Sequence, residues 1–156
     1  MLKVLLDTNI LLDVILKRDP WMEYGKSILE AGRDGRRMEA YVASLSLKDV
    51  YFVSTKILGE PQARAFLQFI MESCQVLAVG ARTCAAALAG PEPDFEDGLV
   101  AAATLEGGMD AIISRDTAAF GNLPIPKIDP QLFARFFLSE SPHPAQTGEH
   151  WGVVNL

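Results

Sequence analysis

The chain has 156 residues, 49% of them hydrophobic, and a formal net charge of −6. This length suits one domain with a sizeable core, and the hydrophobic fraction excludes a disordered chain. The acidic total differs from the basic excess usual at nucleic-acid interfaces, although a local patch or bound cations can reverse the sign. No apolar run is long enough to span a membrane, and no signal peptide is apparent. The two cysteines lack metal-type spacing, so we expect a cytoplasmic protein with reduced thiols.

Strand and helix patterns alternate along the chain as far as residue 138. Strands are expected at 2–6, 41–44, 75–79 and 111–114, with a short edge strand at 125–128, where prolines argue against a central position. Helices are expected at 8–17, with Thr8 or Asn9 near the N-cap, and at 19–31, with Asp19 as the N-cap. Further helices are expected at 45–58, 60–73, 81–89, 94–106 and 129–138. This alternation predicts a three-layer α/β/α fold with a mostly parallel sheet of four to five strands. The domain is expected to span residues 1–138, followed by a polar C-terminal tail at 139–156.

Acidic residues recur where this connectivity reaches one edge of the sheet. They end the first strand, follow the second and fourth strands, and open the helix that leads into the fourth strand: Asp7, Asp49, Asp116, Asp94, Glu96 and Asp97. Strand ends and the starts of these helices share the carboxyl edge of a parallel sheet, where active sites are often built. Carboxylates gathered there repel one another unless a cation compensates them, and such hard oxygen ligands suit Mg²⁺ or Mn²⁺. A metal-dependent phosphoester reaction is therefore the leading hypothesis.

Taken singly, most of these acids have an ordinary structural explanation, such as capping a helix, complementing its dipole or pairing with a lysine. Such explanations apply to Asp49 beside Lys48, to Asp94 and Asp97 at the start of their helix, and to Asp116 before residues 117–120. Asp13 is expected to be solvated or locally bonded on the first helix. Asp7 has no evident structural need, so the shared-edge argument depends on it most.

Three segments resemble motifs of the PIN domain family, in the right order and spacing. They are Leu-Leu-Asp-Thr-Asn at 5–9, Asp-Phe-Glu-Asp-Gly-Leu-Val-Ala-Ala-Ala at 94–103, and Ile-Ile-Ser-Arg-Asp at 112–116 followed by Phe120. The resemblance spans residues 2–138 and is to bacterial toxins of the VapC type, in the subgroup with an Asp-Phe-Glu-Asp start. It implies a Mg²⁺- or Mn²⁺-dependent endoribonuclease that hydrolyses RNA phosphodiester bonds and is held by an antitoxin protein.

The resemblance also implies roles for individual residues. Asp7, Asp97 and Asp116 match the metal ligands, and Asp49 matches a fourth catalytic acid that is usually a glutamate in a Ser-x-x-x-x-Glu context. Thr8, Asn9, Ser114 and Asp94 resemble residues that support the acids. Arg115 would help to bind the substrate phosphate or point into solvent. The basic residues Lys17, Arg18, Arg33, Arg36 and Arg37 are candidates for an RNA-holding patch, although a solvated surface is the commoner explanation.

Two other functions stay open on the sequence alone. A catalytically weak PIN-like domain could bind RNA or protein without cutting, which Asp49 and the acidic balance motivate. A phosphatase or phospho-receiver would need a lysine at a later strand end, and Lys127 is the candidate. Apolar residues on the early helices (Trp21, Met22, Tyr24 and Ile28) and within 51–70 could contact an antitoxin or a second copy in a homodimer, although core packing explains most of them.

Overall fold

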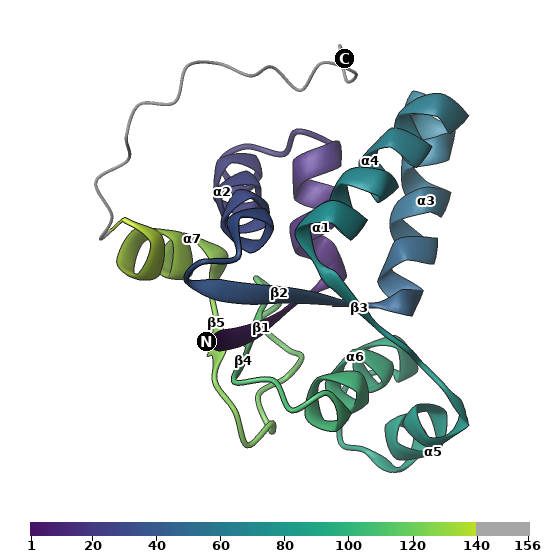
Figure 1. Cartoon of the computed structure of the whole chain (residues 1–156). Coiled ribbons are helices and arrows are strands. Elements are labelled where there is room, and N and C mark those ends of the chain that lie inside the picture. Colours follow the sequence, from purple (N-terminus) through teal and green to yellow (C-terminus); the bar gives the residue numbers. More distant parts are fainter. Residues whose placement is uncertain (140–156) are drawn as a thin grey trace.

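A five-stranded, all-parallel sheet forms the middle layer of the protein, which a computed structural model describes for residues 1–139 (Figure 1). The sheet order is β3-β2-β1-β4-β5. The strands are β1 (Leu2–Leu6), β2 (Met38–Ala43), β3 (Gln75–Leu77), β4 (Ala111–Ile113) and β5 (Lys127–Ile128). Residues 140–156 of the expected C-terminal tail lie outside the described residues.

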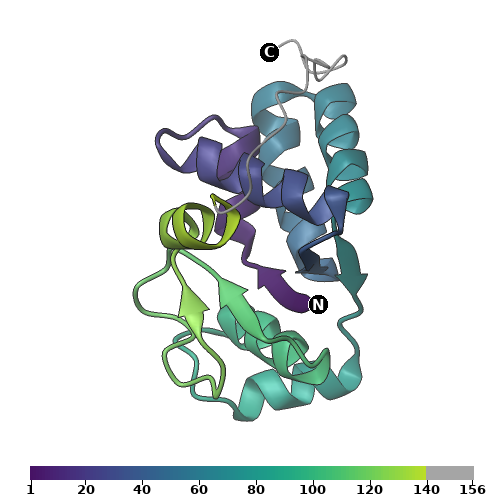
Figure 2. The ribbon, with the colours of Figure 1, turned by 60° about the vertical axis from the view of Figure 1, so that its left-hand side comes forward.

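Helices cover both faces of this sheet, as Figures 1 and 2 show. The helices are α1 (Thr8–Ile15), α2 (Trp21–Asp34), α3 (Ser44–Leu58), α4 (Glu60–Ser73), α5 (Ala81–Ala89), α6 (Phe95–Glu106) and α7 (Pro130–Phe133), which continues as a π-helical segment, η1 (Ala134–Leu138). The larger core cluster joins one face of the sheet to α1–α4 and α7, and the smaller cluster joins the other face to α6. Helix α5 packs beside α6. The predicted three-layer α/β/α fold is confirmed.

The central strand β1 is buried on both faces. Val4 and Leu6 enter the larger cluster, and Leu5, between them, enters the smaller one. All three side chains are fully buried. A continuous apolar run of this kind is typical of a parallel strand covered by helices on both sides, because successive side chains point to opposite faces. The Val-Leu-Leu run before Asp7 therefore fixes β1 in the middle of the sheet.

The chain leaves β1 toward β2 on one side and returns to pair β4 on its other side. Such a change of direction opens a crevice at the carboxyl ends of the two strands. The backbone N–H of Asp7 donates to the carbonyl of Ile113 at 3.0 Å, one residue beyond β1. This bond brings the residues that follow the two strands, Asp7 and Ser114, side by side.

The structure corrects several expected boundaries. Strand β2 starts at Met38 instead of residue 41, because Met38, Ala40 and Val42 alternate into the core and the strand pairs with β1 from Leu2 onward. Ser44, expected in that strand, already opens α3. Strands β3 and β4 are shorter than expected, and α2 begins at Trp21 with Pro20 as its N-cap, so the expectation that Asp19 caps it is wrong.

The structure also describes the two cysteines and shows whether any described helix could span a membrane. Cys74 and Cys84 are both free thiols, and burial raises the pKa of Cys74 to about 12, which keeps it protonated and unreactive. Within residues 1–139, none of the helices combines the length and the apolar character needed to cross a membrane.

Candidate functional site

Asp7 lies where β1 passes into α1, and its side chain is only 7% exposed. Its Oδ1 accepts the backbone N–H of Thr8 at 2.7 Å, and its Oδ2 accepts Asn9 Nδ2 and Ser114 Oγ, each at 2.6 Å. Asp7 is thus the N-cap of α1, which corrects the expectation that Thr8 or Asn9 caps it and gives Asp7 a structural role. Burial raises the pKa of Asp7, and the hydrogen bonds from Ser114 and Thr8 oppose this rise.

The predicted supporting residues join Asp7 in one hydrogen-bond network. Ser114 Oγ accepts from Asn9 Nδ2 at 3.2 Å and from the backbone N–H of Asp116 at 3.0 Å. Thr8 Oγ1 pairs with Ser46 Oγ at 2.8 Å, which ties the start of α1 to the first turn of α3. Ser46, which is fully buried, is a supporting residue that sequence reasoning missed. Its position within Ser-Leu-Ser, directly after a strand, was the available signal.

Asp94 and Asp97 lie at the start of α6 and have different roles. Asp94 is the N-cap, because its Oδ1 accepts the backbone N–H of Asp97 at 2.9 Å, so the structural explanation for Asp94 is confirmed. The pKa of Asp97 is raised to about 6, first by desolvation and then by the charges of Asp94, Asp116, Asp7 and Glu92. Asp97 therefore lies within electrostatic reach of both other predicted metal ligands.

Asp116 shapes the loop that follows β4. Its Oδ1 accepts the backbone N–H groups of Ala118 at 2.7 Å and Ala119 at 2.9 Å, which lower its pKa and confirm its capping role. Lys127 Nζ donates to the backbone carbonyls of Asp116 and Ala119, each at 2.7 Å. The lysine that a phospho-receiver would require is thus engaged in holding this loop.

Asp49 is paired with the lysine that precedes it on α3. Its Oδ1 is 2.6 Å from Lys48 Nζ, and the charge of Glu96 also acts on Lys48. Asp49 is not among the groups that shift the pKa of Asp7, Asp97 or Asp116. The structure therefore couples three of the four predicted catalytic acids and leaves the fourth paired with its neighbour on α3.

Arg115 turns toward α1. Its Nε and Nη2 donate to Oδ2 and Oδ1 of Asp13 at 2.6 and 2.9 Å. Asp13 is 1% exposed, so it is not solvated; it is bonded locally to Arg18 Nη1 at 3.5 Å as well as to the distant Arg115. The expectation that Arg115 points into solvent is wrong, because its side chain is 31% exposed and two of its donors are engaged.

The donor set suits a hard divalent cation. Carboxylate oxygens favour Mg²⁺ or Mn²⁺. Desolvation and then repulsion by neighbouring acids raise the pKa of Asp97, and a bound cation would relieve the repulsion. The buried Oδ1 of Asn9, beside Asp7, has no hydrogen-bond partner in the described part of the chain, and a cation or water would satisfy it. Across residues 1–139, no three His, Cys, Asp or Glu side chains are close enough to bind one ion as they stand. The residues thus fit a metal by chemistry and charge.

The candidate RNA patch is largely paired with acids. Arg18 Nη1 is 3.5 Å from Asp13, Arg33 Nη2 is 3.5 Å from Glu72, and Arg36 Nε is 2.7 Å from Asp34. The pairs of Arg33 and Arg36 lie on the surface, where such pairs are weak and can exchange for a phosphate. The RNA-holding role of these arginines stays a prediction.

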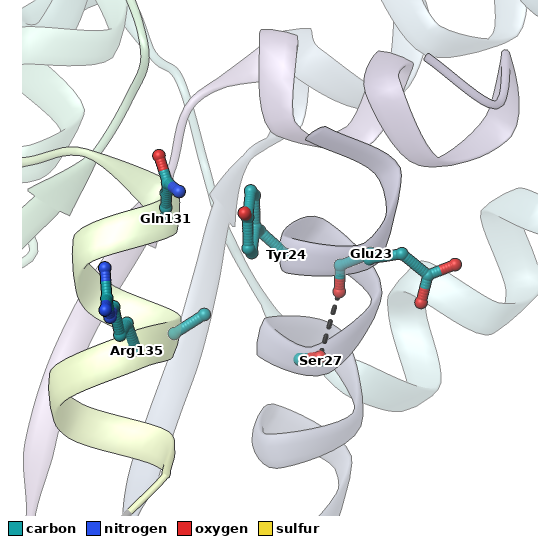
Figure 3. Close-up of a pocket in the computed structure, with 6 residues that line it drawn as sticks. Glu23, Tyr24, Ser27, Gln131 and Arg135 are labelled. Atoms are coloured by element: carbon teal, nitrogen blue, oxygen red, sulfur yellow. Dashed lines mark hydrogen bonds between the residues drawn. The ribbon is translucent and has the colours of Figure 1, made fainter. Parts of the chain in front are cut away.

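A separate pocket of about 440 Å³ lies between α2 and the α7–η1 segment (Figure 3). Its lining consists of Glu23, Tyr24, Ser27, Gln131, Ala134 and Arg135. None of the predicted catalytic or supporting residues lines it. The acidic cluster and this pocket are therefore two different features of the surface.

Comparisons with known proteins agree with this arrangement. A search of curated proteins finds no match, but VapBC2 from Rickettsia felis bound to a promoter DNA fragment superposes with a TM-score of 0.63 at 14% identity, covering 82% of this chain and 98% of that one. A toxin–antitoxin complex from Klebsiella pneumoniae gives 0.62 at 20% identity, covering 81% and 97%. VapC20 of Mycobacterium tuberculosis, a sarcin-ricin loop cleaving toxin, gives 0.59 at 14% identity, covering 81% and 99%.

At these identities the solved structures show a shared fold. The family follows from the sequence itself, because the model of the PIN domain matches residues 3–118, more than half of the chain. That match includes Asp7, Asp97 and Asp116 and ends just after the last of them. This chain belongs to the PIN domain family.

Proposed function

We propose that this protein is a Mg²⁺- or Mn²⁺-dependent endoribonuclease that hydrolyses RNA phosphodiester bonds in the cytoplasm, as the toxin of a toxin–antitoxin pair. The observation that carries the proposal is the gathering of Asp7, Asp97 and Asp116 at the carboxyl edge of β1 and β4, where desolvation and then the charges of neighbouring acids raise the pKa of Asp97 to about 6. The family and the toxin structures that share the fold support it.

Asp7, Asp97 and Asp116 would hold the ion. When bound, it would supply positive charge that activates water and stabilises the phosphate in hydrolysis. Ser114 and Asn9 orient the Asp7 carboxylate, and Lys127 and the N–H groups of the 118–119 turn position Asp116. Burial, and then the charges of the neighbouring acids, raise the pKa of Asp97 to about 6, so binding of a cation there should weaken as pH falls below about 6.

One observation favours a second candidate function. Asp49 is paired with Lys48 at 2.6 Å and does not act on the other three acids. A site without its fourth acid would bind RNA or a protein partner and cut slowly or not at all. Metal-dependent cleavage by the wild-type protein is the result that would exclude this alternative.

The partner half of the proposal concerns an apolar surface on α3 and α4. Phe52 and Ile57 are 57% and 61% exposed, and Met71 is 61% exposed. The early-helix residues contribute less, because Ile28 is fully buried and Trp21, Met22 and Tyr24 are partly covered. We propose that an antitoxin, or a second copy of the chain, covers the α3–α4 surface. Light scattering of the Phe52→Glu variant, alone and with its antitoxin, would show reduced assembly if this is right.

Titration of Mn²⁺ into the metal-free protein by calorimetry tests the metal site. Wild type should bind Mn²⁺, and Asp7→Asn and Asp97→Asn should each lose most of the binding. Glu96→Gln is a matched control, because it removes an exposed charge from the same first turn of α6. Circular dichroism would establish that each variant is folded.

Cleavage of a mixed RNA substrate then tests the reaction. Activity should require Mg²⁺ or Mn²⁺, disappear in Asp97→Asn and persist in Glu96→Gln. Wild type that binds Mn²⁺ and cuts no RNA at high enzyme concentration would reject the nuclease and leave the binding module. Cleavage that persists in EDTA would reject the metal-dependent mechanism.

A further inference from the structure

Asp13 is a buried carboxylate outside the set of predicted metal ligands. Its side chain is 1% exposed and is bonded to Arg115 through two hydrogen bonds, with Arg18 Nη1 a further 3.5 Å away. A buried charge is costly unless it is paired, so Asp13 needs Arg115. Asp13, on the helix that Asp7 caps, thus fixes the position of the Arg115 side chain, which directly precedes Asp116.

Arg115, by contrast, also acts electrostatically on other carboxylates. It stands between Ser114, whose hydroxyl binds Asp7, and Asp116. Its charge acts on both acids, since it lowers the pKa of each. The guanidinium is 31% exposed and lies 5.7 Å from the ring of Trp21. It is therefore not enclosed, and the geometry that holds it is its bond to Asp13.

A guanidinium beside the metal ligands would compete with a cation. It is permanently charged and matches the two oxygens of a carboxylate, so Asp7 or Asp116 would bind it well. The acidic cluster would then lose the negative charge and the free oxygens that a divalent ion needs. We propose that Asp13 is a positioning residue of the metal site, which holds the Arg115 guanidinium against α1 and so keeps it off the carboxylates of Asp7 and Asp116.

A simpler role for the pair is to tie α1 to the loop after β4. In that case the loss of Asp13 would lower the free energy of unfolding. The affinity for Mn²⁺ would fall only to the extent that the fold around the site is disturbed. Under the proposal, the loss acts through Arg115, so removing the arginine as well should restore binding. The double variant separates the two explanations.

The experiment is calorimetric titration of Mn²⁺ into wild type, Asp13→Asn and Asp13→Asn/Arg115→Gln. We expect Asp13→Asn to weaken Mn²⁺ binding by about tenfold or more, because the released Arg115 guanidinium would occupy the carboxylates that bind the ion. The double variant should return to within about threefold of wild type, the scatter expected for such effects. Asp34→Asn and Arg36→Gln, which change the same charges at an exposed pair on the turn before β2, should bind like wild type.

Because the inference rests on the proposed metal site, a second readout is needed that does not depend on metal. A crystal structure of metal-free Asp13→Asn should place the Arg115 guanidinium on Asp7 or Asp116. If Asp13→Asn does not fold, Asp13→Leu, with an apolar side chain at the buried position, replaces it with the same expectations.

The outcomes separate failure of this inference from failure of the proposed function. Wild type without Mn²⁺ binding rejects the metal site, and the crystal structure then still decides what Asp13 does. Unchanged Mn²⁺ affinity in Asp13→Asn, or equal weakening in the single and double variants, overturns the positioning role. A guanidinium that stays on residue 13 or turns into solvent in the crystal overturns it as well.

Discussion

Ser114 Oγ donates a 2.6 Å hydrogen bond to Asp7 Oδ2, across 107 residues of sequence. The bond joins the ends of β1 and β4, the two strands that flank the crevice. Of the interactions that lower the pKa of Asp7, it is the largest, and it opposes the effect of burial. Ser114 therefore favours the ionised form of a buried carboxylate and fixes its orientation, and a metal ligand needs both.

Ser114→Ala should raise the pKa of Asp7 further, because the hydroxyl that stabilises the ionised form is gone. Mn²⁺ binding requires the ionised form, so the affinity should fall by about tenfold at pH 6 and less at pH 8. Titration calorimetry at pH 6 and at pH 8 would measure the Mn²⁺ affinity. Ser27→Ala, on the surface of α2, is the control. An equal loss at the two pH values would show that Ser114 acts on packing alone.

Asp97 should make the metal-free protein less stable as pH rises. Its folded-state pKa of about 6 lies above the ordinary 3.8, so the folded state holds more protons between these values. The free energy of unfolding therefore falls as pH rises from about 4 to about 6 and stays lower above that range.

Asp97→Asn should remove this dependence and raise Tm at pH 8 by about 2 °C in EDTA, a modest shift because solvent screens a half-exposed group. Thermal melts at pH 4 and pH 8 would measure it. A larger gain at pH 4 than at pH 8 would contradict the assignment. Saturating Mn²⁺ should stabilise wild type and leave Asp97→Asn unchanged.

Asp49→Glu should bring the fourth carboxylate closer to Asp7, Asp97 and Asp116. The extra methylene would let the carboxylate extend beyond Lys48, its 2.6 Å partner, toward the other three acids. RNA cleavage should rise by about threefold or more, within the range of general acid–base and electrostatic effects. Asp49→Asn provides the comparison and should bind Mn²⁺ like wild type. An Asp49→Glu variant no faster than wild type would mean that the α3 position does not serve the reaction.

Glu92 should matter for stability through a single bond. Its Oε2 accepts the backbone N–H of Phe120 at 2.7 Å, and Phe120 is buried with a φ of 65°. Glu92→Ala leaves that N–H unpaired and should cost about 1–3 kcal/mol of unfolding free energy in urea. Glu92→Gln keeps an acceptor and should retain most of the stability. Because it also removes a charge near Asp97, it should lower the pKa of Asp97 in an NMR titration.

Connectivity predicted the fold and the gathering of three acids at one edge of the sheet, and it did so for a physical reason. Parallel strands linked by helices have one carboxyl edge, so Asp7, Asp97 and Asp116 had to meet there once the strands were identified. The Val-Leu-Leu run before Asp7 identified the first of these strands. Asp49 shows where this reasoning stops, because an edge fixes the neighbourhood of a residue but not its side-chain partner.

The sequence alone did not predict which residues far apart along the chain pair in the fold. Nothing near Asp13 indicates a partner 102 residues away, so its burial against Arg115 appeared only in the structure. The cap of α1 was missed because Asp7 was assigned to the strand, whereas its carboxylate serves the helix after it. The early start of β2 was missed because Glu39 and the preceding arginines hide the alternation of Met38, Ala40 and Val42.

The 107-residue separation of Asp7 and Ser114 also has a consequence in time. Synthesis delivers β1, β2 and β3 with the helices between them first, and these elements already share most of the larger core cluster. Strand β4 and Asp116 follow only after α6. A nascent chain therefore acquires the complete set of Asp7, Asp97 and Asp116 only when nearly all of its domain has been made, so the proposed nuclease activity would arise late in synthesis. Mn²⁺ binding by stalled nascent chains of increasing length would show when that happens.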